Sequence, residues 1–133
     1  MKAKEVSSAF TTNKVQETKE FYQKYLGANL TFDCGWYINL EFGNESASIQ
    51  FMSPQQSDHK LSNSAGLIYN FNVENVDEEY EKIKEYNLPI ILDIENHPWG
   101  DRGFCIQDPN GISIYIYSEM EPSEEFKKNY KNL

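Results

Sequence analysis

The side chains best suited to hold a small organic molecule gather between Pro98 and Tyr117, in the stretch PWGDRGFCIQDPNGISIYIY. Its aromatic rings can stack on a flat ligand and can attract a cation through their π-electrons. Its arginine, Arg102, could anchor a ligand carboxylate through two parallel hydrogen bonds. Arg102 could instead pair with Glu41, with Asp101 or with a second copy of the chain, and the sequence leaves these readings open.

The two tryptophans stand at similar places in the two halves of the chain. Trp36 and Trp99 each come just before a strand-like run that is the third strand of its half. In these positions they could stack on a planar ligand, or pack at an edge between the two halves or between two subunits. The sequence favours neither reading over the other.

The sequence offers little support for covalent or acid–base catalysis. It contains no Gly-x-Ser-x-Gly motif for a serine nucleophile, and strand alternation predicts Cys105 on the core side of its strand. His97 could act as a general base, but without an evident acid or nucleophile as its partner a surface loop is favoured. Any catalytic residues therefore stay unknown at this point.

The turn at Pro109 decides which side chains of the second half share a face. Asp108–Gly111 has the residues of a tight turn, and both flanking runs alternate with the period of two expected of strands. A two-residue turn predicts that Phe104 pairs with Tyr115. The core face would then hold Ile112, Ile114 and Ile116, and the ligand-binding face would hold Arg102, Phe104, Tyr115 and Tyr117.

The same argument applies to the first half. The run 47–52 follows a turn signal at 43–46 and pairs across it with the run 36–42, which sets Leu40 opposite Ile49. The opposite face is too polar for a dry core, and it predicts a ligand pocket or a wet groove. Its residues are Tyr37, Asn39, Glu41, Ser48, Gln50 and Met52.

The elements that carry these faces occur twice in the same order, as a strand, a helix and three strands. In the first half they are the strands 6–12, 28–33, 36–42 and 47–52, with a helix that starts at Val15 and ends at Gly27. In the second half they are the strands 67–73, 89–94, 102–107 and 112–117, with a helix marked by Val76, Tyr80 and Ile83. Phe126 and Tyr130 lie at helical spacing in the charged tail.

Composition limits the class of protein. The 133 residues fit one compact domain, and a net charge of −9 argues against nucleic acid as a partner, because phosphates attract basic surfaces. An acidic surface would favour a cationic ligand. No signal peptide and no apolar run of membrane length are evident. The two cysteines, Cys34 and Cys105, are expected to be reduced in a cytoplasmic protein.

The motif Trp99-Gly-x-Arg102-x-Phe104, followed by Asp108–Gly111, resembles the closing hairpin of the vicinal-oxygen-chelate superfamily. This superfamily holds glyoxalase I, extradiol dioxygenases and the bleomycin-resistance proteins, and the motif most resembles the bleomycin-resistance branch. The resemblance covers nearly the whole chain. It implies an α+β fold in which two tandem βαβββ modules form a curved sheet around a cleft, and it implies a homodimer. Within the single domain, module one would span 5–53, a linker 54–64, module two 65–118 and a C-terminal helix 119–133.

The resemblance also allows a test for a metal site. In the metal-using members four ligands, usually His, Gln or Glu, come from the first and last strands of the two modules. Carried over to this chain, these positions are Ser7, Gln50, a position near Ile68 in the strand 67–73, and Tyr115. Only Gln50 is a residue of the usual kind, whereas a catalytic ion needs about three protein ligands. His59 and His97 stand elsewhere, so we expect no metal and no cofactor.

The favoured reading is a metal-free protein of the glyoxalase/bleomycin-resistance type that binds a small organic molecule, planar or cationic and drug-like, and acts by sequestration. Its predicted ligand-binding residues are Trp36, Tyr37, Asn39, Glu41, Gln50, Trp99, Arg102, Phe104, Tyr115 and Tyr117. The alternative is an enzyme of the same superfamily, a lyase, isomerase or dioxygenase, which is either metal-dependent or uses Tyr115 or Glu41 as acid or base. A third reading is a structural or regulatory dimer with an empty groove.

Overall fold

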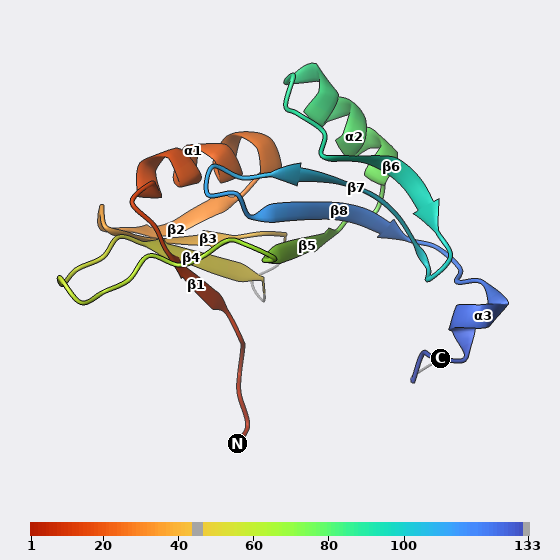
Figure 1. Cartoon of the computed structure of the whole chain (residues 1–133), viewed down its shortest axis with the longest axis horizontal. Coiled ribbons are helices and arrows are strands. Elements are labelled where there is room, and N and C mark those ends of the chain that lie inside the picture. The colour runs from red at the N-terminus through yellow and green to blue at the C-terminus, as the bar shows by residue number, and fades with distance from the viewer. Residues whose placement is uncertain (44–46, 132–133) are drawn as a thin grey trace. The chain divides into compact units, whose positions relative to one another are not determined.

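The computed structural model describes residues 1–43 and 47–131 (Figure 1). The chain divides into two compact units. Unit one comprises Met1–Ser64 together with Asp108–Asn110, and unit two comprises Ala65–Gln107 together with Gly111–Leu133. Three residues of the second half therefore belong structurally to the first.

Unit one contains one helix and a four-stranded mixed sheet. In chain order its elements are β1 (Ser8–Thr11), α1 (Val15–Leu26), β2 (Asn29–Asp33), β3 (Tyr37–Glu41) and β4 (Ser48–Met52). The strand order in the sheet is β1-β4-β3-β2, and β1 runs parallel to β4 while the other pairs are antiparallel. The core includes Tyr22 from the helix and Ile38, Leu40 and Phe51 from the sheet, all fully buried.

Helix α1 lies across one face of this sheet because its apolar residues recur at helical spacing (Figure 1). Val15, Thr18, Phe21 and Tyr22 are buried on the sheet side. The helix ends where Gly27 adopts φ 65°, a left-handed conformation that glycine accepts without strain, and the N–H of Gly27 donates to the Tyr22 carbonyl. The predicted start and end of this helix are both confirmed.

Unit two repeats the arrangement. Its elements are β5 (Ile68–Asn72), α2 (Val76–Glu85), β6 (Leu92–His97), β7 (Asp101–Gln107), β8 (Ser113–Glu119) and the short α3 (Glu124–Lys127). The sheet order is β5-β8-β7-β6, with β5 parallel to β8. Asn75 caps α2 by accepting the Glu78 N–H, and Val76 and Ile83 bury the inner side of that helix. The predicted α+β fold of two βαβββ modules is confirmed.

Most strand bounds differ from the prediction by one or two residues, and the larger differences are in β6 and in the C-terminal helix. β6 runs from Leu92 to His97 rather than from 89 to 94, because Pro89 has no N–H for a sheet ladder and the first bond of this edge is Ile91 N–H to the Cys105 carbonyl. His97 is thus the last residue of a strand and not part of a loop. The predicted helix 119–133 is one short turn of helix, α3. The turn predicted at 43–46 includes positions 44–46, which lie outside the described residues.

Within residues 1–43 and 47–131, no helix has the length and apolar character that a membrane crossing requires.

Candidate ligand-binding site

The hairpin of β7 and β8 pairs one residue away from the prediction. Gln107 pairs with Ser113, so five residues rather than two connect the strands, and Cys105 instead of Phe104 lies opposite Tyr115. Because side chains alternate along a strand, this shift by one residue moves every side chain of β7 to the other face. The predicted group of Arg102, Phe104, Tyr115 and Tyr117 is therefore divided between the two faces of the sheet.

The longer connection has a physical cause in its own side chains. Asp108 accepts the N–H of Asn110 at 2.8 Å, and its other oxygen accepts the Tyr22 hydroxyl at 2.8 Å. Asn110 bonds to the hydroxyls of Thr12 and Thr18, at 2.6 and 3.0 Å. Asp108 is buried, and these bonds satisfy it within unit one. The turn motif is therefore a packed structural element, and a two-residue turn could not reach these partners.

The corrected register changes the role of two predicted site residues. Phe104 is fully buried among the core residues of unit two, where its ring meets Tyr80 edge-on at 5.1 Å. Arg102 reaches α2 on the same side, with two guanidinium nitrogens on Asp77 at 2.9 and 3.2 Å, and a third bond to Asn96 at 3.0 Å. Asp77 is not among the partners that the sequence suggested for Arg102. Cys105, predicted on the core side, lies on the face of Tyr115 instead.

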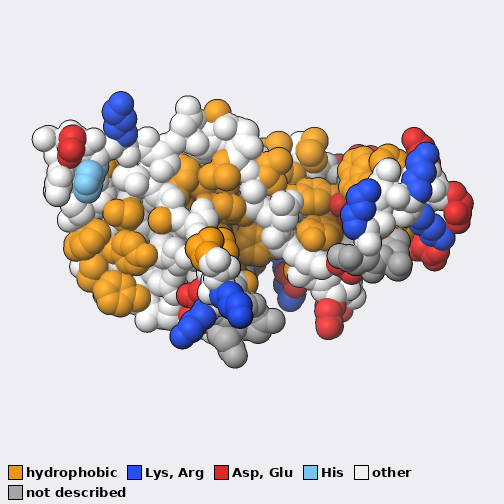
Figure 2. Space-filling model, turned by 90° about the horizontal axis from the view of Figure 1, so that it is seen from below, with side chains coloured by type: hydrophobic (Ala, Val, Ile, Leu, Met, Phe, Trp, Pro, Cys, Tyr) orange, Lys and Arg blue, Asp and Glu red, His pale blue; other side chains and the backbone are white. Residues whose placement is uncertain are grey.

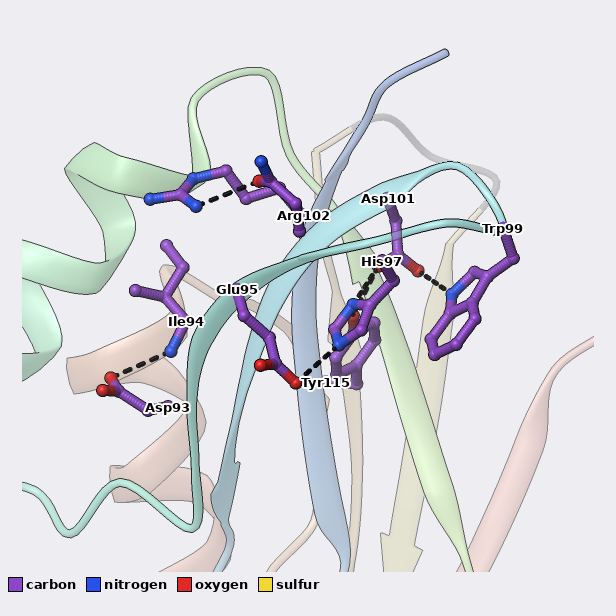
Figure 3. A network of polar contacts seen from close by, with 9 residues as sticks. Asp93, Ile94, Glu95, His97, Trp99, Asp101, Arg102 and Tyr115 are labelled. Carbon is purple, nitrogen blue, oxygen red and sulfur yellow. Dashed lines mark hydrogen bonds and ion pairs between the residues drawn. The ribbon is translucent and has the colours of Figure 1, made fainter. Parts of the chain in front are cut away.

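The opposite face of unit two carries a connected group of aromatic and charged side chains, shown in Figure 3 and called here the Asp101 cluster. It consists of Glu95, His97, Trp99, Asp101 and Tyr115. Asp101 stands at the centre and its side chain is only 14% exposed. One carboxylate oxygen accepts the Tyr115 hydroxyl at 2.6 Å and lies 2.8 Å from His97 Nδ1. The other accepts the Trp99 indole N–H at 2.9 Å.

His97 has an acidic partner on each ring nitrogen. Nδ1 faces Asp101, and Nε2 lies 3.1 Å from a carboxylate oxygen of Glu95. Burial disfavours the charged imidazole, but the bonds to Asp101 and Glu95 outweigh it and raise the pKa of His97 above the ordinary value of 6.5. The imidazole also stacks face to face on Trp99, with ring centroids 4.4 Å apart and planes 4° from parallel. The acid partners of His97 that were not evident from the sequence are therefore Asp101 and Glu95, which the fold brings to its ring nitrogens.

Tyr117 continues the aromatic surface of the Asp101 cluster along β8, next to Tyr115. Their rings stack with centroids 5.6 Å apart. Gly103 provides the space, because a Cβ at this position would lie 2.5 Å from the Tyr115 hydroxyl oxygen and 2.9 Å from the Ile116 carbonyl oxygen. Burial and the bond to Asp101 raise the pKa of Tyr115 well above that of a free tyrosine. At neutral pH Tyr115 is therefore a hydrogen-bond donor rather than a base.

The polar face of unit one has the register that the sequence predicts. Leu40 pairs with Ile49, Asn39 with Gln50, and Glu41 with Ser48. Gln50 is 7% exposed, and its amide donates to Asn39 at 2.5 Å. Asn39 in turn donates to Thr31 at 2.6 Å.

Beside this amide chain stand three aromatic rings. Tyr37 meets Phe32 at 6.0 Å and Trp36 at 5.8 Å, both edge-on. Phe32 and Trp36 are 53% and 44% exposed. Figure 2 shows hydrophobic side chains gathered in groups over the face that it presents. Exposed apolar patches of this kind are typical of binding surfaces.

Unit one also has a cavity of about 220 Å³ that the sequence did not predict. It lies between β1, the loop that leads from β1 to α1, the polar linker and Asn110, and residues from all of these line it. The lining residues are Phe10, Thr11, Thr12, Asn13, Lys14, Leu61, Ser62 and Asn110. None of them belongs to the predicted site, and the cavity depends on linker positions whose place no local pattern indicates.

The residues at the expected metal positions do not fit a divalent ion. The strand registers set Ala9 beside Gln50 and Asn70 beside Tyr115, in place of Ser7 and Ile68. The Gln50 amide and the Tyr115 hydroxyl are engaged with neighbours in their own sheets. Within the described part of the chain, no three His, Cys, Asp or Glu side chains are grouped so that they could hold a metal ion.

The structure thus sorts the ten predicted residues into three groups. Unit two brings together Trp99, Tyr115 and Tyr117, and unit one brings together Tyr37, Asn39, Glu41 and Gln50 on one face, with the Trp36 ring in contact with that of Tyr37. Arg102 and Phe104 are excluded from the face of Tyr115. Sequence reasoning missed Glu95, His97 and Asp101 as site residues. The available signal was their spacing, since residues 95, 97 and 101 share a face when a hairpin closes at 98–100.

Comparisons with known proteins agree with this fold. Residues 6–116 match the family model of the Glyoxalase/Bleomycin resistance protein/Dioxygenase superfamily. A lactoylglutathione lyase from Agrobacterium tumefaciens has a similar structure, with a TM-score of 0.69 at 17% identity over 87% of this chain and 94% of that one. A superfamily member from Sphaerobacter thermophilus gives 0.71 at 20%, over 88% and 98%. A virulence protein from Salmonella typhimurium gives 0.70 at 18%, over 90% and 100%. No curated protein matches the chain.

Proposed function

The chain belongs to the glyoxalase/bleomycin resistance protein/dioxygenase superfamily, and from this premise we propose that it binds a planar, cationic organic compound without a metal ion. It acts by holding that compound, as the bleomycin-resistance-like members of its superfamily would. The observation that carries the proposal is the Asp101 cluster, in which two carboxylates stand beside stacked aromatic rings.

The charge of the cluster supports a cationic ligand. His97 faces the carboxylates of both Asp101 and Glu95, so even when the imidazole is protonated its one positive charge stands against two negative charges. Glu119 pairs with Asp101 across β7 and β8 and adds a third acid on this face. The net charge of −9 also favours the approach of a cation.

The rings of the cluster support a planar ligand. Trp99 is 46% exposed, so part of the indole is left for contact, and Tyr117 is half-buried beside Tyr115. Aromatic faces attract cations and stack on flat rings. Unit one has a separate aromatic and polar surface of its own, formed by Trp36 and Tyr37 with Asn39, Glu41 and Gln50, which we propose as a second place for such a ligand.

Matched probes test both properties of the ligand. Proflavine is planar and cationic, acridine is planar and mostly neutral in mildly alkaline buffer, and tetraethylammonium is cationic without being planar. We expect saturable binding of proflavine by isothermal titration, weakened by added salt, and much weaker binding of the other two. Equal affinity for proflavine and acridine would contradict the role of the carboxylates. Binding of none of the planar probes would reject the proposed function.

A specific observation also favours a second function, a metal-free enzyme. Tyr115, Asp101 and His97 form a closed triangle of contacts at 2.6, 2.8 and 3.1 Å, so a proton donor and a histidine stand together. Such a group could protonate a carbonyl oxygen and move a proton at the adjacent carbon. Deuterium incorporation from heavy water into a panel of carbonyl compounds, followed by NMR, would reveal this activity. It should disappear in Tyr115→Phe.

The superfamily resemblance also supports a homodimer, and the free cysteines Cys34 and Cys105 favour the cytoplasm, so we propose both. Light scattering at micromolar concentration should give about twice the 15.5 kDa of one chain. A clean monomer would contradict the dimer without affecting the ligand proposal.

A further inference from the structure

The C-terminal segment, defined here as Met120–Tyr130, packs on the turn that carries Trp99. The segment and the turn are joined by main-chain hydrogen bonds, from Met120 N–H to the Gly100 carbonyl at 2.9 Å and from Ser123 N–H to the Pro98 carbonyl at 2.8 Å. These bonds connect residues before and after Trp99 to the same stretch of chain. The turn is therefore fixed from outside its own hairpin.

Two side chains of the segment reach Trp99 itself. The Tyr130 hydroxyl donates to the Trp99 carbonyl at 2.5 Å. The Phe126 ring meets the indole edge-on, with centroids 6.4 Å apart and an interplanar angle of 78°. Trp99 is thus held on one side by His97 and contacted on another by Phe126.

Gly100 allows this close approach. It has φ 119°, and a Cβ there would lie 2.9 Å from the Tyr130 hydroxyl oxygen and 3.1 Å from Pro122. Such a conformation is nearly confined to glycine, which bends the turn so that the segment can lie against it. The turn and the segment are therefore shaped for each other.

The indole needs such support because its own turn gives it little. Trp99 lies outside both strands of its hairpin, is 46% exposed, and is joined to the sheet face by its bond to Asp101 and its stack on His97. An exposed ring at a glycine-containing turn would otherwise be free to rotate away from His97.

We propose that the C-terminal segment holds Trp99 over His97, and that Phe126 and Tyr130 are positioning residues for the ligand site. The segment fixes the position of the Trp99 indole, on which a planar ligand stacks. It therefore affects ligand affinity although it is not part of the hairpin. This inference rests on the proposed function for its effect on the ligand. The placement of Trp99 can be measured independently of any ligand.

Tryptophan fluorescence reports that placement. In a Trp36→Phe background, Trp99 is the sole tryptophan. A protonated imidazole quenches an indole stacked on it, so emission should fall as His97 gains its proton in the range where histidine titrates. Phe126→Ala and Tyr130→Phe should each reduce the amplitude of this change, because the two rings no longer stay face to face. Glu125→Gln, on the exposed side of α3, is the matched control and should behave as the background does.

The ligand arm uses proflavine and the same segment variants with Trp36 restored. Tyr130→Phe should weaken proflavine binding about fivefold, the scale of one lost hydrogen bond. Tyr130→Phe removes a single hydroxyl, and circular dichroism should show an unchanged fold. If both variants keep the full pH-dependent quenching, the segment does not position Trp99 and the inference is wrong. If quenching is reduced but proflavine affinity stays at the wild-type value, the effect on the site is rejected. Failure of the wild type to bind proflavine would instead refute the proposed function, while the fluorescence result still decides the placement of Trp99.

Discussion

The two sheets have the same topology but place their aromatic rings on different strands. Strand pairing shows which positions of the two sheets correspond. Gln50 of β4 corresponds to Tyr115 of β8, because each pairs with the parallel first strand of its own sheet at the same register. On the neighbouring strand, Tyr37 corresponds to Gly103, since they pair with Met52 and Tyr117. Unit one therefore has an amide where unit two has a phenol, and a ring where unit two has a glycine.

This exchange explains why the two faces differ in chemistry. Gly103 leaves room above β7, and the Tyr115 ring fills it and reaches Asp101. In unit one Tyr37 occupies the corresponding space, and the buried Gln50 satisfies its polar atoms along a neutral chain of amides. One βαβββ frame thus supports a charged aromatic cluster around Asp101 in one copy and a chain of neutral amides at Gln50 and Asn39 in the other. Fold alone therefore does not determine function.

The largest expected effect distinguishes the two faces of β8. Ile114 is fully buried on the core side, so Ile114→Ala removes packing atoms and leaves a cavity. It should cost about 2–5 kcal/mol in the free energy of unfolding, measured by urea denaturation. Tyr115→Ala, on the opposite face, should cost less. A larger loss for Tyr115→Ala than for Ile114→Ala would mean that the assignment of the faces is wrong.

A second prediction compares the corresponding positions of the two sheets. If the planar cation stacks on unit two, Tyr115→Ala should weaken proflavine binding by about 1–3 kcal/mol, the value of a lost stacked aromatic contact. Gln50→Ala, its counterpart, removes an amide without a ring and should weaken binding much less. Isothermal titration of both variants provides the measurement. Equal losses would contradict the assignment of the stacked contact to Tyr115 of unit two.

The pH dependence of stability sharpens the comparison, because the Asp101 cluster contains a histidine and the amide chain does not. His97 has a raised pKa in the folded state. Its contribution to stability is therefore fully present below the unfolded histidine pKa and is lost as pH rises through the folded value. The melting temperature should fall over that interval, and His97→Gln should remove this part of the profile. His59→Gln is the control, and an unchanged profile in His97→Gln would contradict the prediction.

Much of this architecture could be predicted from the sequence, because it depends on local patterns. The limits of α1 follow from the spacing of Val15, Phe21 and Tyr22 and from Gly27, and the register of β3 and β4 follows from alternation. The register of β7 and β8 could not be predicted, since Asp108 and Asn110 bond to residues about ninety positions away in the chain. The Asp101 cluster was missed for a different and local reason, because the predicted strand ended at 94 and placed His97 in a loop, whereas β6 runs on to His97 and sets its acids on one face.

The smallest expected effect tests the corrected place of Arg102. The β7–β8 register predicted from the sequence would set Arg102 at the rim of the ligand site. In the structure its guanidinium lies on the helix side of the sheet, paired with Asp77. The Asp77 side chain is exposed and the Arg102 side chain is about one-third exposed, and such pairs contribute little to stability because water and salt screen them. Arg102→Ala should leave proflavine affinity unchanged and lower the melting temperature only slightly. Asp77→Asn, which breaks the same pair from α2, should give the same small change. If Arg102→Ala markedly weakens ligand binding and Asp77→Asn does not, the loss cannot come from the broken ion pair. Arg102 would then contact the ligand, contrary to the prediction.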